Sequence, residues 1–449
     1  MGIATPRACL AIVAALGSFA IPARAEGPAT APTAERLRSL LADEMGRWYP
    51  AAVDDRGGFH QDIARDWSIG PDRERSLVYQ SRMTWTAAAY AEFDPSRRDE
   101  SLRYARHGLA YLDETMRDAE QGGFHWILGP DGKLDPKLGD EKHVYGTAFV
   151  IYAAAKVRAV AGDDRALKVA RDAFDWLEAH AHDAEHGGWF EGIRRDGTAI
   201  KTYDPAAPVA ARQDRLGVYY GFKTMNSHIH ILEALAELAK VDDRPIVRER
   251  LEEALRLVRD RIAVEPGALN LYLTRDWRAI PAHDSFGHDV ETAYLLVEAA
   301  ETLHMPDDAR TWEVARSLMD HALDWGWDER HGGFNDKGDA FAAGSHDFTK
   351  VWWTQAEGLN ALAVMDHRFG RETDRYARAL AEQWRFIERH MLDPEHGGWF
   401  AEAERDGRLR GDGAKASQWK ANYHTARAMM NVARILSPTP ENPGKQHSR

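Results

Sequence analysis

Gly57-Gly58-Phe59 is the first of five copies of a Gly-Gly-aromatic tripeptide, and the spacing of these copies decides the fold. The others are Gly122-Gly123-Phe124, Gly187-Gly188-Trp189, Gly332-Gly333-Phe334 and Gly397-Gly398-Trp399. Neighbouring copies lie 65 residues apart, except across one interval of 145 residues. A degraded copy at Pro266-Gly267 divides that interval, 65 residues before Gly332. A fixed period indicates a repeat architecture, here with six units of about 65 residues.

Segments with helical periodicity flank each turn. Those before the turns carry charge on one side, as half-exposed outer helices do: 35–47, 101–117, 166–180, 248–262, 308–325 and 374–390. Those after the turns are rich in Ala, Trp, Tyr and His, as an inner ring would be: 80–91, 145–160, 224–239, 287–303, 350–365 and 420–436. Asp-Gly pairs after several turns indicate short β-hairpins. We therefore predict an all-α fold, a closed ring of twelve helices with short β-hairpins in the connecting loops.

Residues 1–25 are predicted to form a cleavable signal peptide. Arg7 is its basic region, 8–21 is its apolar stretch, and Ala23-Arg24-Ala25 is an Ala-x-Ala cleavage site. The apolar run is too short to span a membrane, and it contains the single cysteine, Cys9. We expect a periplasmic or secreted protein without disulfides, with one barrel domain over 26–437 and a disordered, Pro-rich tail over 438–449.

The formal net charge of −13 argues against nucleic acid and anionic membranes as partners, because both require a basic face. The 15 tryptophans are consistent with aromatic packing or with a carbohydrate site. An excess of 15 residues before the fourth turn maps to 201–217, which we interpret as an insertion over one mouth of the ring. We expect a small sugar as the partner, and a monomer or weak homodimer.

Unusual polar residues recur at one phase of the repeat, near the start of the inner helices. Counted from the first glycine of each turn, Arg82 lies 25 residues on, His288 and Trp353 lie 21 on, and His424 lies 27 on. His230 lies 28 on once the 15-residue insertion is subtracted. Residues at one phase of different units converge at one end of a ring, so this phase predicts a single site.

Helical spacing sharpens the prediction. Asn226, His230 and Glu233 share one helix face, whereas His228 points elsewhere, which argues against a metal site built from the two histidines. His288 and Glu291 are three residues apart. We expect them to hydrogen-bond, which would orient the imidazole or raise its pKa.

At these motifs the chain resembles the N-acylglucosamine 2-epimerase superfamily, and within it the cellobiose 2-epimerases, over almost the whole mature chain. The resemblance implies an (α/α)6 barrel. It departs from the expected pattern at Ser227, at Ala293-Tyr294 and in the 201–217 insertion. It rests on Tyr79-Gln80-Ser81-Arg82, Lys142-His143-Val144-Tyr145-Gly146, the segment from Lys223 to His230, Gly287-His288-Asp289-Val290-Glu291, the segment from Lys350 to Glu357, and Trp419-Lys420 with Tyr423-His424.

The resemblance also implies residue roles. His288 and His424 would be the acid/base pair, His230 would assist in ring opening or binding, and Arg82 would stabilise negative charge. Glu291 would position the substrate or a histidine. The substrate-binding candidates are Tyr145, Asn226, Trp352, Trp353, Glu357 and Trp419.

The predicted reaction is inversion at C2 of a reducing-end aldose of the glucose/mannose type, in a β-1,4-linked disaccharide such as cellobiose or mannobiose. Histidine suits abstraction of the proton next to an aldehyde, and Arg82 suits the enediolate that results. The scheme requires no metal and no cofactor. The alternatives are an aldose–ketose isomerase of the mannose/fructose type, a periplasmic (α/α)6 glycoside hydrolase, which would need two catalytic carboxylates, and a non-catalytic sugar-binding protein.

Overall fold

The computed structural model describes residues 29–437, apart from 72, 207, 209–211, 215, 216 and 343. The predicted signal peptide and the predicted tail lie outside the described residues.

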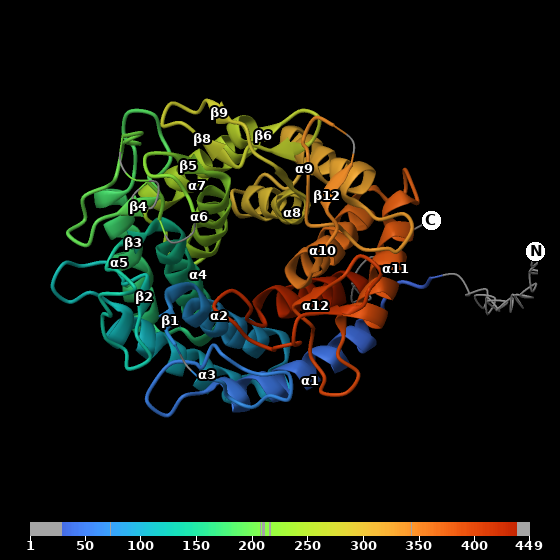
Figure 1. Ribbon diagram of the computed structural model, residues 1–449, viewed down its shortest axis with the longest axis horizontal. Helices are drawn as coiled ribbons and strands as arrows, with labels where there is room; N and C mark the ends of the chain where they lie inside the picture. The colour runs from blue at the N-terminus through green and yellow to red at the C-terminus, as the bar shows by residue number, and fades with distance from the viewer. Residues whose placement is uncertain are drawn as a thin grey trace, which may run out of the picture.

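Two concentric rings of helices make up the described chain (Figure 1). Each inner helix packs against the next, and α12 packs against α2, which closes the ring. The inner helices are α2 (Leu77–Phe93), α4 (Val144–Ala161), α6 (Met225–Leu238), α8 (Phe286–Thr302), α10 (Trp352–Phe369) and α12 (Tyr423–Leu436). The outer helices are α1 (Ala34–Ala52), α3 (Arg98–Tyr111), α5 (Asp164–His180), α7 (Pro245–Leu257), α9 (Ala309–His321) and α11 (Arg375–Phe386). The predicted (α/α)6 barrel is confirmed.

Burial explains the different compositions of the two rings. Every residue of α2 except Glu92 is buried, whereas α3 buries only one face. A short 3-10 turn, η1 (Pro95–Arg97), precedes α3. Four outer helices continue into a π turn, which brings their ends close to the predicted ones: η2 (Leu112–Met116), η4 (Val258–Ile262), η5 (Ala322–Gly326) and η6 (Ile387–Met391). The inner helix α4 is apolar and long enough to cross a membrane, but 78% of it is buried inside the barrel.

The Gly-Gly turns reverse the chain between the outer and the inner ring. In the second turn, Gly122 and Gly123 have φ of 72° and 68°, a region that glycine enters at little cost. A single bridge between Arg117 and Phe124 closes the turn. A Cβ atom on Gly123 would lie 2.6 Å from Cε2 of Trp176. The aromatic ring of the next outer helix therefore requires glycine at this position.

Gly123→Ala should destabilise the protein by about 2–4 kcal/mol, because it combines left-handed strain with a clash. Gly162→Ala is the matched control: Gly162 has φ of 66°, but a Cβ atom there would meet nothing within 4 Å. The control should lose only about 1–2 kcal/mol. Urea unfolding of both variants measures the difference, and equal losses would show that the Trp176 contact does not restrict the turn.

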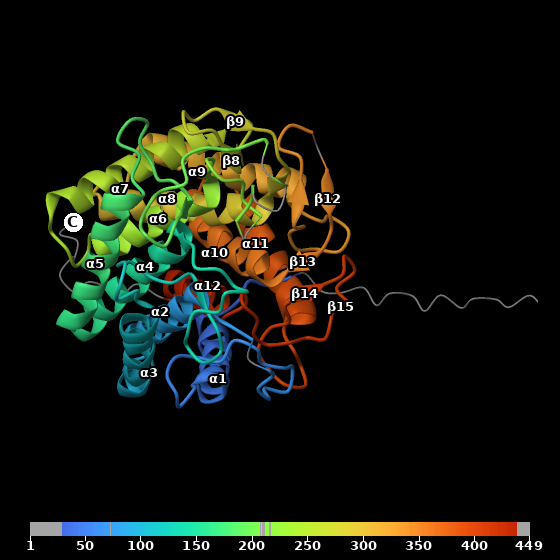
Figure 2. The same cartoon turned by 60° about the vertical axis from the view of Figure 1, so that its left-hand side comes forward.

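Short strands link neighbouring units, on the side of the barrel where β12 to β15 stand in Figure 2. We call this side the hairpin mouth. The strand that precedes an inner helix pairs with the hairpin of the next unit. The sheets are β1 (Arg75–Ser76) with β2 (Ile127–Leu128), β3 (Lys142–His143) with β4 (Gly192–Ile193), β5 (Lys223–Thr224) with β8 (Tyr272–Leu273) and β9 (Ala279–Ile280), β10 (Asp284–Ser285) with β11 (Lys337–Gly338) and β12 (Ser345–Asp347), and β13 (Lys350–Val351) with β14 (Glu402–Ala403) and β15 (Leu409–Arg410).

The predicted hairpins are confirmed at β8–β9, β11–β12 and β14–β15. Their pairing across units was not predicted, because it depends on which unit lies beside which. A bridge between Ile63 and Ala416 joins the last unit to the first. The fourth turn differs from the others: β6 (Ala263–Val264) pairs with β7 (Ala268–Leu269) around it.

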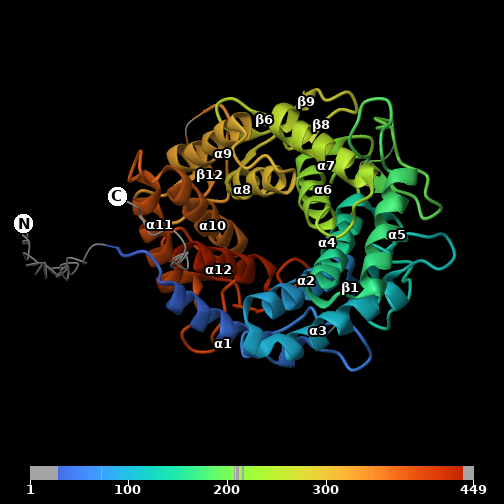
Figure 3. The same cartoon turned by 180° about the vertical axis from the view of Figure 1, so that it is seen from behind.

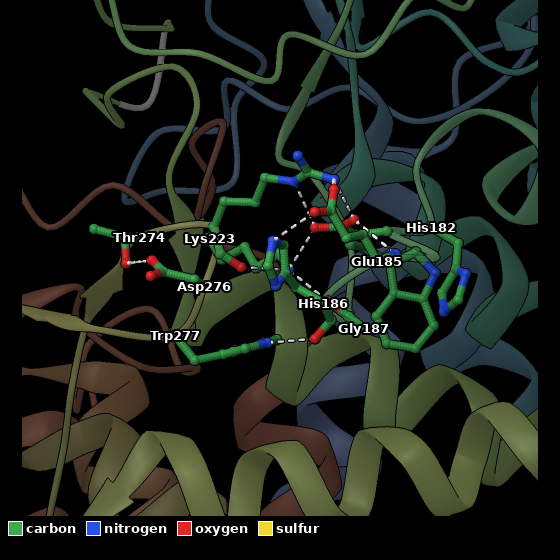
Figure 4. Close-up of polar contacts among 12 residues, drawn as sticks. His182, Glu185, His186, Gly187, Lys223, Thr274, Asp276 and Trp277 are labelled. Atoms are coloured by element: carbon green, nitrogen blue, oxygen red, sulfur yellow. Dashed lines mark hydrogen bonds and ion pairs between the residues drawn. The ribbon is translucent and has the colours of Figure 1, made fainter.

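A buried cation holds each regular turn to the strand before its inner helix. In the third unit, the Lys223 ammonium lies 3.0 Å from the Asp183 carboxylate and donates to the Gly187 carbonyl (Figure 4). Arg275, from the hairpin of the next unit, also donates to Asp183. We call the lysine or arginine at the Lys223 position the junction cation. Its counterparts are Arg75 with Asp54, Lys142 with Asp118, Lys350 with Asp328 and Lys415 with Asp393.

The described part of the predicted 201–217 insertion packs beside the connection that precedes α4. Asp214 lies 2.7 Å from Nε2 of His143. Just after the insertion, the Tyr220 hydroxyl donates to Glu141, and Val218 reaches the central cavity. The segment therefore borders the hairpin mouth.

Candidate active site

A cavity of 520 Å³ opens at the hairpin mouth between the inner helices. The five predicted catalytic residues all line it: Arg82, His230, His288, Glu291 and His424. Five of the six predicted substrate-binding residues also line it: Tyr145, Asn226, Trp352, Trp353 and Trp419. The structure therefore brings these residues into one place, and their roles stay predictions.

These side chains converge because of where the inner helices begin. Arg82 lies on α2, His230 on α6, His288 on α8 and His424 on α12, each within the first two turns of its helix. Because all inner helices begin at the hairpin mouth, one phase of the repeat places these side chains at one end of the ring.

His424 presents one ring nitrogen to the cavity because the other is engaged below it. Its Nδ1 lies 2.5 Å from Oε1 of Glu357. Glu357 also accepts from Arg427 at 2.7 Å and from the Tyr294 hydroxyl at 2.6 Å, so it acts as a carboxylate acceptor. Nδ1 of His424 therefore carries a hydrogen, which leaves Nε2 as a lone-pair acceptor. Burial, followed by the charge of Arg82, lowers the pKa of His424 well below its ordinary value.

Glu357 is the exception among the predicted substrate-binding residues. Its side chain is fully buried and does not line the cavity. Glu357 orients His424 instead. The sequence placed it at the correct phase, but phase alone did not show that its carboxylate lies beneath the histidine.

The predicted hydrogen bond between His288 and Glu291 is wrong. Nδ1 of His288 lies 2.7 Å from the Ser285 hydroxyl, and the Glu291 carboxylate binds Arg427 at 2.5 Å. Burial, followed by the charges of His230 and His424, lowers the pKa of His288 to about 3, opposite to the expected rise. His288 lacks the carboxylate that would favour its protonated form.

His230 has a carboxylate partner on the helix face that it shares with Glu233. Its Nδ1 lies 2.9 Å from Oε2 of Glu233. His228 points away, and its Nε2 accepts from the backbone amide of Trp189 at 3.1 Å. Beside His230, the buried Oδ1 of Asn226 has no hydrogen-bond partner among the described residues, so it is available to a ligand.

Arg427 is the main residue that sequence analysis missed. Its guanidinium binds Glu233, Glu291 and Glu357, the first and last of which orient His230 and His424. Burial would raise the pKa of Glu233, but Arg427 and His230 outweigh it and lower the pKa to about 2. The signal was present in the sequence: Arg427 lies three residues after His424 on an inner helix, where the ring is otherwise poor in charge.

Arg82 is held with one donor unused. It donates to the Tyr145 hydroxyl at 3.0 Å and to the Trp419 carbonyl at 3.1 Å, while its buried Nε has no partner among the described residues. The Phe149 ring lies 4.6 Å from its Cζ atom. A fixed guanidinium with a free N–H suits a developing oxyanion.

Tryptophan rings border the histidines. Trp353, on the helix between α8 and α12, lies 4.8 Å from the His288 ring and 5.8 Å from the His424 ring, centroid to centroid. Trp419 is 37% exposed at the rim, with Trp126 at 6.3 Å. Flat apolar rings with a few polar groups are typical of a small-molecule site.

Three comparisons with known proteins agree with this geometry. The sequence model of the family described as N-acylglucosamine 2-epimerase matches residues 57–428. A cellobiose 2-epimerase of Bacteroides fragilis is 29% identical over 402 residues, covering 89% of this chain and 97% of the relative. A D-mannose isomerase of Marinomonas mediterranea is 24% identical over 421 residues, with coverage of 89% and 97%. The structure of a cellobiose 2-epimerase from Spirochaeta thermophila superposes with a TM-score of 0.77 at 30% identity, covering 90% of this chain and 97% of the other.

Proposed function

The chain belongs to the N-acylglucosamine 2-epimerase family, and we propose that it is a carbohydrate 2-epimerase that inverts C2 of a reducing-end aldose. The substrate we propose is a β-1,4-linked disaccharide of the glucose/mannose type, such as cellobiose or mannobiose. Relatives named as cellobiose 2-epimerases support this choice, as does the open rim at Trp419, where a second sugar ring would lie.

The observation that carries the proposal is the different Nδ1 partner of each histidine. His424 donates from Nδ1 to a carboxylate, so its Nε2 is a base. His288 can accept at Nδ1 from the Ser285 hydroxyl, in which case its Nε2 carries a hydrogen and is an acid. Two histidines in opposite tautomers are what a proton transfer across C2 requires.

The reaction then balances without a cofactor. Nε2 of His424 takes the C2 proton of the open-chain aldose, and the electron pair moves into an enediolate. Arg82 binds the oxyanion. His288 gives its Nε2 proton to the opposite face of C2 while its Nδ1 takes the proton of the Ser285 hydroxyl, which restores the aldehyde with C2 inverted. The proton that His424 has taken returns through solvent to Ser285, so both histidines end the cycle neutral. His230, oriented by Glu233, assists ring opening.

Aldose–ketose isomerisation is the second candidate, because a relative is named as a D-mannose isomerase. It would follow if one histidine returned the proton to C1. The two reactions share the enediolate and differ in which carbon is reprotonated.

Incubation of cellobiose, mannobiose, glucose and mannose with the enzyme in D2O, followed by NMR, tests the proposal. We expect deuterium at C2 of the reducing-end sugar and a mixture of both C2 epimers. A ketose as the sole product would establish the isomerase. Monosaccharide release from a disaccharide would establish a hydrolase, and the absence of exchange in every sugar would contradict both candidates.

A further inference from the structure

The fourth turn differs from the others in the charges buried around it. Asp284 occupies the position of the junction cation, where other units have lysine or arginine. In the hairpin of the next unit, Ala340 occupies the position from which Arg275 and its counterparts Arg65, Arg195 and Arg405 bind a turn. This junction therefore has carboxylate where the regular junctions have cations.

A second carboxylate and an imidazole complete a buried cluster there. Nδ1 of His321, at the end of α9, lies 3.5 Å from Oδ2 of both Asp284 and Asp289. One atom from each of the three side chains lies within 4.8 Å of the other two. The two aspartates are 0% exposed and His321 is 3% exposed.

Five of the six side-chain polar atoms of this cluster lack a hydrogen-bond partner of regular geometry among the described residues. They are both oxygens of Asp289, both ring nitrogens of His321 and Oδ2 of Asp284. Buried polar atoms are nearly always paired, because an unpaired one carries a desolvation penalty. Five together make this cluster a candidate site for a ligand from outside the chain.

The same positions in other units have structural side chains. At the position of Asp289, Gln80, His228 and Gln355 accept from the backbone amide of the turn aromatic. At the position of His321, the outer helices carry Tyr111, Trp176 and Phe386, whose rings pack under the glycines. Around the fourth turn, two carboxylates and an imidazole thus replace a cation, a neutral acceptor and an aromatic ring.

We infer that Asp284, Asp289 and His321 bind a divalent transition-metal ion of the Zn2+ class in place of the missing junction cation. Zinc binds imidazole and carboxylate at about 2.0–2.2 Å, which places neighbouring ligands of a tetrahedron about 3.4 Å apart. The observed separations of 3.5 Å are close to this value. Mg2+ and Ca2+ prefer all-oxygen sites, so the imidazole disfavours them.

His321 also borders a cavity of 640 Å³ beside α9, which offers a path for the ion and room for water as a fourth ligand. A second cluster of two carboxylates and an imidazole, Glu291, Glu357 and His424, already has Arg427 as its cation.

Metal uptake by the full-length protein tests the inference. Chelator-treated protein is titrated with ZnCl2 by calorimetry, and CoCl2 is added separately to record visible d–d absorption. We expect one ion per chain and a rise of about 2–5 °C in the thermal midpoint with excess Zn2+.

Asp289→Asn and His321→Ala should each weaken Zn2+ binding by at least about tenfold and abolish the cobalt spectrum. His180→Ala is the matched control, since His180 also ends an outer helix but bonds a backbone carbonyl. It should bind zinc like the wild type. Asp289→Asn is isosteric and leaves a neutral side chain in the buried cluster, so its metal-free form should be about as stable as the wild type. Binding unchanged in both variants, or no uptake by the wild type at 10-fold excess of either ion, would overturn the inference and leave a proton-sharing carboxyl pair.

Discussion

His288→Ala and His424→Ala should each lower the epimerisation rate by about 10²–10⁴-fold, the usual contribution of a positioned acid or base. The sharper expectation concerns exchange in D2O. A variant with one histidine can still remove the C2 proton from the epimer that faces it and return deuterium to the same side. Each variant should therefore exchange C2 of one epimer only, without inversion, and the two variants should select opposite epimers.

His180→Ala serves as the control, because it removes a half-buried histidine that does not line the cavity. Far-UV circular dichroism checks that each variant is folded. If both variants exchanged both epimers, or if neither histidine changed the rate, the assignment of His288 and His424 as the acid/base pair would be wrong.

Arg427→Met should destabilise the protein by about 3–5 kcal/mol at neutral pH, the usual loss when a buried charge loses its partner. Here one guanidinium neutralises three carboxylates, so its removal leaves Glu233, Glu291 and Glu357 close together without a cation. Arg427→Lys should lose less, because it keeps the charge but cannot bridge three groups. Urea unfolding measures both losses.

The pH dependence has a definite sign. In the wild type, the pKa of Glu233 is about 2, below its ordinary 4.5, so its contribution to stability is present above pH 4.5 and is lost as the pH falls toward 2. In Arg427→Met, burial without the cation raises the pKa of Glu233 and Glu357. That variant should therefore gain stability as the pH falls from 7.5 to 5.5. The loss of unfolding free energy in Arg427→Met should depend on pH, and a second substitution, Glu291→Gln, should reduce it. If either expectation failed, Arg427 would not be the cation that stabilises the three carboxylates.

The sequence predicted the architecture well, because each glycine pair marks a position where only a residue without a side chain fits. It also predicted which side chains meet, since equal phase in a ring implies one end of the barrel. The sequence did not predict which groups those side chains bind. Glu291 and Glu357 were assigned to His288 and to substrate, whereas both bind Arg427. Helical spacing reports neighbours on one helix, and Arg427 joins carboxylates from three other helices.

The same limit applied to the strands and to the fourth junction. The Asp-Gly pairs predicted hairpins, but the pairing of β10 with β11 requires knowing which units adjoin. Asp284 and Asp289 are visible in the sequence as ordinary acidic residues. Their proximity to His321, which belongs to the following unit, depends on the tertiary fold.

Closure of the ring links catalysis to the last step of folding. Helix α1 packs against α12, and the first and last units share a bridge (Figure 3). Open repeat arrays fray from their terminal repeats, but a closed ring has no terminal repeat to lose. Arg82 comes from the first unit and His424 from the last, so a chain that lacks either terminal unit has an incomplete site. Turnover therefore reports that the ring has closed. During refolding, activity should return together with the contact between the first and last units, which is the most non-local contact in the ring, and not with the earlier formation of helices.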